Sequence, residues 1–208
     1  MIPRPSLPGW KCLVCAIIFP YPVSIFIGVI SAYVLRDCGL SKSSIGLVVD
    51  TLVIGSLLLT SLFVRLKLFG RTFCFVKSYS LIPLILIALF LLPVFAWKRS
   101  VECVSPYYMA LAIPWRSLDY LRLVVMVPLA EEFYFRGLLL DAFMLLNASV
   151  KTAILCQTIV FVVIHQLLNP IGIVWTSYVG IAMGVAAARY GLVYAILLHF
   201  SIILILID

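Results

Sequence analysis

Two adjacent glutamates, Glu131 and Glu132, lie in the middle of the apolar segment VVMVPLAEEFYFRGLLLDAF. A charged side chain at bilayer depth costs roughly 2.5–3.5 kcal/mol, so such groups mark functional sites. In a helix, Glu132 and Arg136 are four residues apart and face each other, which predicts a charge-assisted pair. Glu131 points about 100° away and has no such partner. We therefore predict that Glu131 is a general base.

Both histidines of the chain, His165 and His199, also lie inside apolar segments. Phe161 and His165 are four residues apart, which places the imidazole beside an aromatic ring on one helix face. Intramembrane ionisable groups face the bundle interior or a water-filled cavity. We therefore predict that three helices bring Glu131, His165 and His199 to one polar site, within reach directly or through one water.

Seven apolar segments make up most of the chain, and each is close to the roughly 20 residues that cross a bilayer as a helix. They cover residues 12–35, 45–64, 79–97, 121–147, 152–169, 171–188 and 191–207. Hydrophobic residues form 65% of the chain and charged residues 11%, unlike soluble proteins. The sequence predicts an all-α, polytopic transmembrane bundle of about seven helices. We expect a single integral membrane domain over 1–208, with the catalytic motifs in about 120–208.

The formal net charge of +7 could indicate nucleic-acid binding. Lys and Arg, however, cluster between the apolar segments, as in the basic loop that begins at Arg65, and not on one amphipathic face. This is typical of charges at a membrane surface, so we predict membrane lipids and no nucleic acid as partners. With seven spans, eight basic residues fall on the N-terminal side and six on the other, which favours a cytoplasmic N-terminus.

Three motifs in the second half resemble the CAAX prenyl protease and bacteriocin-processing family, also called the Abi family, of intramembrane endopeptidases. Two match in full: EExxxR at 131–136 and FxxxH at 161–165. The third, HxxxN or HxxxD, begins at His199 but has Ile203 where Asn or Asp is expected. The resemblance covers about residues 120–208. We expect an integral protein of the bacterial inner membrane.

The resemblance implies hydrolysis of a peptide bond near the membrane, in a small peptide or a lipidated protein. The first glutamate and the first histidine would activate a water, and the second histidine and the Asn would stabilise the oxyanion. We accordingly predict the catalytic residues Glu131, Glu132, His165 and His199, supported by Arg136 and Phe161. Without the Asn, one oxyanion donor is missing, which typically costs roughly 10²–10³ in rate. Ser201 and Asn169 are candidate substitutes, although neither is at the expected position.

Three alternatives stay open. One Glu and two His suffice as ligands of catalytic zinc, so a zinc protease would use His165, His199 and Glu131, whereas the prediction above needs no cofactor. A non-catalytic protein of bacteriocin maturation or self-immunity, with peptide-toxin export or maturation partners, would not need Glu131. A proton-coupled carrier would also use buried carboxylates and histidines. For Asp50, alone in the second apolar segment, the sequence leaves open a helix-packing hydrogen bond, a helix end or a functional role.

Overall fold

The computed structural model describes residues 9–36, 38–69, 82–98, 113–146, 148–165 and 170–207. The helices of the first half are α1 (Gly9–Ile18), α2 (Pro20–Leu35), α3 (Lys42–Phe69) and α4 (Ile82–Lys98). Those of the second half are α6 (Ile113–Leu121), η1 (Arg122–Met126), α7 (Val127–Glu132), η2 (Phe133–Leu139), α8 (Leu140–Leu145), α9 (Val150–Ile164), α10 (Pro170–Tyr190) and α11 (Leu192–Ile207). The elements α6 to α8 follow one another without a break. When α6–α8 and the joined pair α1–α2 are each counted as one helix, the described residues form seven helices and no strand, which confirms the predicted all-α bundle.

Three described helices are long and apolar enough to cross a membrane: Trp10–Leu35, Lys42–Phe69 and Pro170–Tyr190. Other apolar segments form shorter helices, at Ile82–Leu92, Val150–Ile164 and Leu192–Leu206. Large apolar side chains lie on the outside of the bundle, for example Tyr33 at 75% and Val174 at 69% exposure. Soluble monomers rarely expose large apolar patches, whereas lipid favours such a surface. The protein is a polytopic membrane protein.

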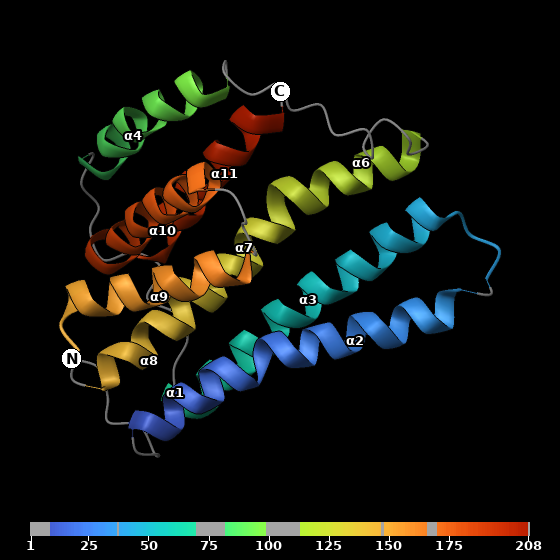
Figure 1. Cartoon of the computed structure of the whole chain (residues 1–208), viewed down its shortest axis with the longest axis horizontal. Helices are drawn as coiled ribbons and strands as arrows, with labels where there is room; N and C mark the ends of the chain where they lie inside the picture. Colours follow the sequence, from blue (N-terminus) through green and yellow to red (C-terminus); the bar gives the residue numbers. More distant parts are fainter. Residues whose placement is uncertain are drawn as a thin grey trace.

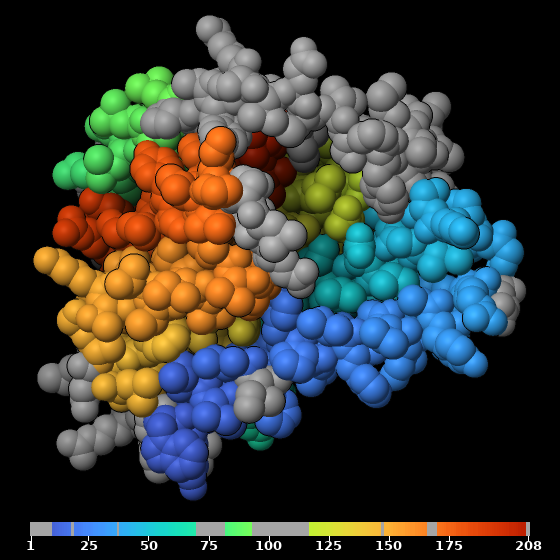
Figure 2. Space-filling model, viewed as in Figure 1, coloured from blue at the N-terminus to red at the C-terminus, as the bar shows by residue number. Residues whose placement is uncertain are grey.

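The continuous helix α6–α8 runs between two groups of helices (Figure 1). On one side α2 packs along α3, and on the other α9 packs along α10 and α10 along α11, with α4 against α11. Both α7 and η2 contact α3 as well as α11. In the space-filling view the blue-to-cyan α2–α3 pair and the orange α9 and α10 occupy opposite sides of the visible face (Figure 2). The glutamates of α7 are thereby placed at the centre of the bundle.

Two glycines allow α10 to approach α9 closely. A Cβ on Gly180 would lie 2.9 Å from Thr158 Cγ2, and one on Gly184 would lie 2.9 Å from Gln157 Nε2. Gly180 and Gly184 are four residues apart, the spacing by which small residues bring membrane helices together. The buried Gln157 Nε2 also donates to the Gly180 carbonyl at 3.2 Å. This contact fixes α9, and with it His165, against the centre of the bundle.

A buried ion pair joins α3 to the helix that carries the glutamates. Arg65 is 2% exposed, and its Nη1 lies 2.7 Å from Asp141 Oδ2 in α8. The same nitrogen donates to the Gly137 carbonyl. Our interpretation of Arg65 as a charge of a surface loop is therefore wrong, because α3 continues to Phe69 and carries Arg65 into the bundle.

Candidate active site

Glu131 and Glu132 end the short α-helical segment α7, which lies between two π-helical segments. Pro128 in this segment has no N–H for the preceding turn, and just before it the Val127 N–H donates to the Arg122 carbonyl, five residues back. The five-residue turns are a helix distortion of the kind that occurs at prolines. Such π-helical turns occur frequently at functional sites.

Glu132 is completely buried and is held by two donors. Its Oε1 accepts from Arg136 Nη1 at 2.8 Å, which confirms the predicted pair, and from His199 Nδ1 at 2.9 Å. A carboxylate that pairs with a guanidinium is ionised and can only accept hydrogen bonds. Nδ1 of His199 must therefore carry a proton, and Nε2 is the nitrogen left for chemistry.

His165 lies at the C-terminal cap of α9 and is oriented by its own helix. Its Nδ1 lies 2.8 Å from the Phe161 carbonyl, so Nδ1 is again the protonated nitrogen. The imidazole also contacts the Phe161 ring, with 4.2 Å between centroids, as the sequence predicts. The helix α9 is described to Ile164 with His165 as its cap, and Asn169, where we expected the helix to end, lies outside the described residues. Histidine side chains near a helix end often bond the carbonyls of the last turn, as His165 does here.

The structure brings Glu131 together with both histidines. Glu131 Oε2 lies 3.8 Å from His165 Nε2 and 3.9 Å from His199 Nε2. Among the described residues this oxygen has no hydrogen-bond partner. The two separations exceed a direct hydrogen bond but are within the reach of one bridging water. A carboxylate oxygen and two imidazole nitrogens, each from a different helix, thus face one small space.

Arg136 connects the helices that meet at this site. Besides its bond to Glu132, its Nη2 donates to the Gly180 carbonyl of α10 at 3.4 Å. Its Cζ lies 4.5 Å from the centroid of the Phe161 ring of α9, a cation–π contact. Phe161 therefore lies between Arg136 and His165. Arg136 of the first motif thus contacts Phe161 of the second, a contact between two helices that the spacing within each motif does not predict.

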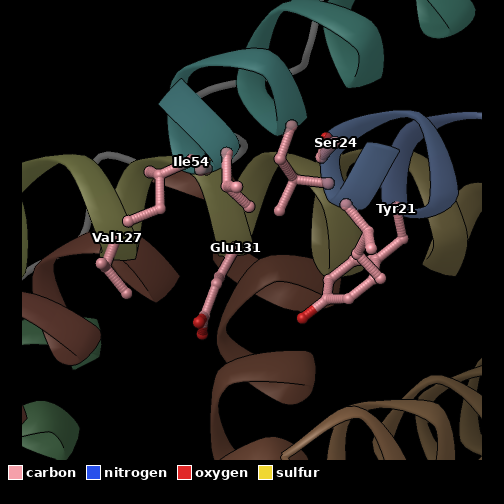
Figure 3. Close-up of a pocket in the computed structure, with 9 residues that line it drawn as sticks. Tyr21, Ser24, Ile54, Val127 and Glu131 are labelled. Atoms are coloured by element: carbon pink, nitrogen blue, oxygen red, sulfur yellow. The ribbon is translucent and has the colours of Figure 1, made fainter. Parts of the chain in front are cut away.

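Glu131 also lines a cavity of about 120 Å³ between α2, α3 and α7 (Figure 3). Its other polar lining side chains are Tyr21 and Ser24 of α2, and most of the wall is apolar, with Ile54 and Val127 among the lining residues. Sequence reasoning missed Tyr21. A tyrosine in an apolar helix is ordinary, and only helix packing places it beside a glutamate of the distant α7.

The residues considered as substitutes for the missing Asn do not fill its place. Ile203 is half-buried in α11 and has no side-chain donor. Ser201 Oγ donates to the Leu197 carbonyl of its own helix at 2.8 Å. Asn169 lies outside the described residues.

Asp50 lies apart from these groups. Its side chain is 52% exposed, and its Oδ2 lies 3.6 Å from Arg122 Nη1. Arg122 also donates from Nε to the buried Asp119 at 2.9 Å. The pairing of Asp50 thus agrees with a role in helix packing.

The fold and the site define a class: a helical membrane protein in which three helices bring a carboxylate and two imidazoles together. The family model described as "Rce1-like", type II CAAX prenyl endopeptidase Rce1-like, matches residues 113–205. This range includes all three motifs, so the match supports the family resemblance that the motifs indicate. The second half of the chain is thus similar to the type II CAAX prenyl endopeptidases. No curated protein and no solved structure matches the chain.

Proposed function

We propose that the chain is a metal-independent intramembrane endopeptidase in which Glu131 is the general base. The observation that carries this proposal is the position of Glu131 Oε2, 3.8 Å and 3.9 Å from the two Nε2 atoms. A water in this space would contact both the base and an imidazole. The family match to a CAAX prenyl endopeptidase model supports the reaction class.

The reaction begins with a water between Glu131 and His165. Glu131 Oε2 takes a proton from the water, the water oxygen attacks the scissile carbonyl carbon, and the electron pair of the C=O bond moves to the oxygen. The C–N bond then breaks, and the proton passes from Glu131 to the leaving amine. His165 orients the water through Nε2, because its Nδ1 is held by the Phe161 carbonyl.

His199 stabilises the oxyanion in this proposal. Its Nδ1 lies 2.9 Å from the ionised Glu132, in the arrangement by which a carboxylate stabilises an imidazolium. With a second proton on Nε2, taken from solvent before the substrate binds, the ring donates from Nε2 to the negative oxygen of the tetrahedral intermediate. Arg136 keeps Glu132 ionised and in place. Glu132 thus acts through His199, and Glu131 acts directly on the water.

We propose as substrate a peptide or a lipidated protein with an apolar group beside the scissile bond. The cavity next to Glu131 is lined mainly by aliphatic side chains of α2, α3 and α7. Such a cavity suits one hydrophobic side chain or the end of an isoprenyl chain. We place the reaction in the bacterial cytoplasmic membrane, as the sequence predicts.

The test is a cleavage assay with the purified protein in detergent and in liposomes. The probes are peptides with a C-terminal CAAX sequence, farnesylated or unmodified on the cysteine. Glu131→Gln keeps the size of the side chain but removes the base, so kcat falls by roughly 10²–10⁴. The matched control is Asp50→Asn, which changes a carboxylate whose side chain is half exposed. Full activity of Glu131→Gln would refute the proposal.

Zinc catalysis is a second candidate, because each histidine has its Nδ1 held by an oxygen. This is the usual arrangement of metal-binding histidines. Among the residues that the structure describes, however, no three His, Cys, Asp or Glu side chains form a group that could hold a metal ion. The response of peptide cleavage to a chelator distinguishes the zinc mechanism from the metal-independent one. A non-hydrolytic role in toxin maturation or immunity predicts a different result, since Glu131→Gln would keep its function in cells.

A further inference from the structure

The oxyanion hole of the proposed reaction has one donor on α11, His199, and lacks the second because residue 203 is isoleucine. Among the described side chains that line the cavity beside Glu131, two carry hydroxyl groups, Tyr21 and Ser24. Ser24 Oγ donates to the Pro20 carbonyl at 2.6 Å and is committed to its own helix. The structure gives the Tyr21 hydroxyl no hydrogen bond to another described residue. Tyr21 therefore has a donor left for a substrate.

The fold holds Tyr21 at the junction of α1 and α2. The junction follows Phe19, and Pro20 and Pro22 on either side of Tyr21 have no N–H for the helix. The Tyr21 ring also contacts the ring of Tyr134, which is 1% exposed, with 5.7 Å between centroids. An aromatic ring held in this way keeps its hydroxyl in a defined place.

The hydroxyl of Tyr21 and the carboxylate of Glu131 extend into the same space. Figure 3 shows the carboxylate of Glu131 and the hydroxyl of Tyr21 pointing in the same direction, Glu131 from α7 and Tyr21 from α2. Tyr21 and Glu131 both line the cavity between α2, α3 and α7. A carbonyl group that is attacked by the water on Glu131 would then lie beside the Tyr21 hydroxyl.

We propose that Tyr21 is the second oxyanion donor and takes the place of the Asn that the third motif lacks. This inference rests on the proposed protease function. A tyrosine hydroxyl is a suitable donor, and enzymes use it to stabilise oxyanions. The two donors then come from different helices, Tyr21 from α2 and His199 from α11.

Tyr21→Phe removes one oxygen and leaves the ring contact with Tyr134 in place. With the farnesylated or unmodified peptide that the wild type cleaves, we expect kcat to fall by roughly 10²–10³ and KM to change little, because an oxyanion donor acts mainly in the transition state. The matched control is Tyr33→Phe on the same helix, where the tyrosine is 75% exposed. It should keep wild-type kcat.

A second variant tests the replacement directly. Ile203→Asn should raise kcat more in the Tyr21→Phe background than in the wild type, because the wild-type site already has two donors. Equal gains in both backgrounds would overturn the inference, as would wild-type kcat in Tyr21→Phe. A rise in KM at unchanged kcat would also overturn it, since it assigns Tyr21 to substrate binding alone.

The two proposals fail in different ways. If Glu131→Gln cleaves the peptide normally, the proposed function fails and the role of Tyr21 fails with it. If Glu131→Gln is inactive while Tyr21→Phe is fully active, the protease function stands and only the role of Tyr21 is wrong.

Discussion

Replacement of Arg136 by alanine tests whether the site is built on a buried charge network. The side chains of Arg136 and Glu132 are both 0% exposed, and 2.8 Å separate Nη1 from Oε1. Arg136→Ala leaves the carboxylate of Glu132 buried with His199 as its remaining donor. Breaking a buried pair by removal of one partner costs about 3–5 kcal/mol.

The contacts of Glu132 and Arg136 narrow the expected loss in the free energy of unfolding. Because His199 Nδ1 still lies 2.9 Å from Glu132, the loss of the ion pair falls near the lower end, at about 3 kcal/mol. Loss of the contact between Arg136 and the Phe161 ring adds about 0.5–2 kcal/mol. We therefore expect Arg136→Ala to lower the free energy of unfolding by about 3.5–5 kcal/mol. This is a large part of the roughly 5–15 kcal/mol by which proteins are stable.

The assay is reversible unfolding in mixed detergent micelles, followed by circular dichroism. Arg189→Ala is the control, because Arg189 is an exposed arginine of α10 and such changes stay within about 0.5 kcal/mol. In Glu132→Gln the buried charge is absent, so Arg136→Ala should cost less there than in the wild type. A free energy of unfolding within about 0.5 kcal/mol of the wild type for Arg136→Ala would refute the buried network.

Three further predictions follow from the packing and the chemistry of the site. Gly180→Ala should lower the free energy of unfolding by about 1–3 kcal/mol through overpacking, because the new Cβ would lie 2.9 Å from Thr158 Cγ2. The control is Gly55→Ala, which should not lower it, because nothing lies within 4 Å of a Cβ at that position. Thr158→Ser should restore part of this loss in unfolding measurements, and the absence of any restoration would contradict the contact. Arg65→Ala should lower the free energy of unfolding by about 3–5 kcal/mol, because the arginine is buried. Asp50→Asn should lower it by less than about 1 kcal/mol, because the carboxylate is half exposed. Equal losses in the two variants would contradict this ranking. Dialysis against a chelator should leave peptide cleavage unchanged, and cleavage that is lost and then restored by zinc would instead establish the zinc mechanism.

The sequence by itself determined the features that depend on spacing within one helix. Residues four apart share a helix face whatever the rest of the chain does. For this reason the Glu132–Arg136 pair and the contact of Phe161 with His165 could both be predicted. The long apolar segments likewise determined an all-α membrane bundle, because only helices and closed barrels satisfy the backbone in lipid.

Only the tertiary structure decided which groups from different helices meet. The bond from His199 to Glu132, and the positions of Tyr21 and Arg65, depend on how helices pack against one another. The sequence shows small residues that permit a close approach between helices, such as Gly180, but it does not show which helix packs against them. Arg65 was misread for this reason: basic residues at a helix end look alike in sequence, and burial depends on the neighbouring helix.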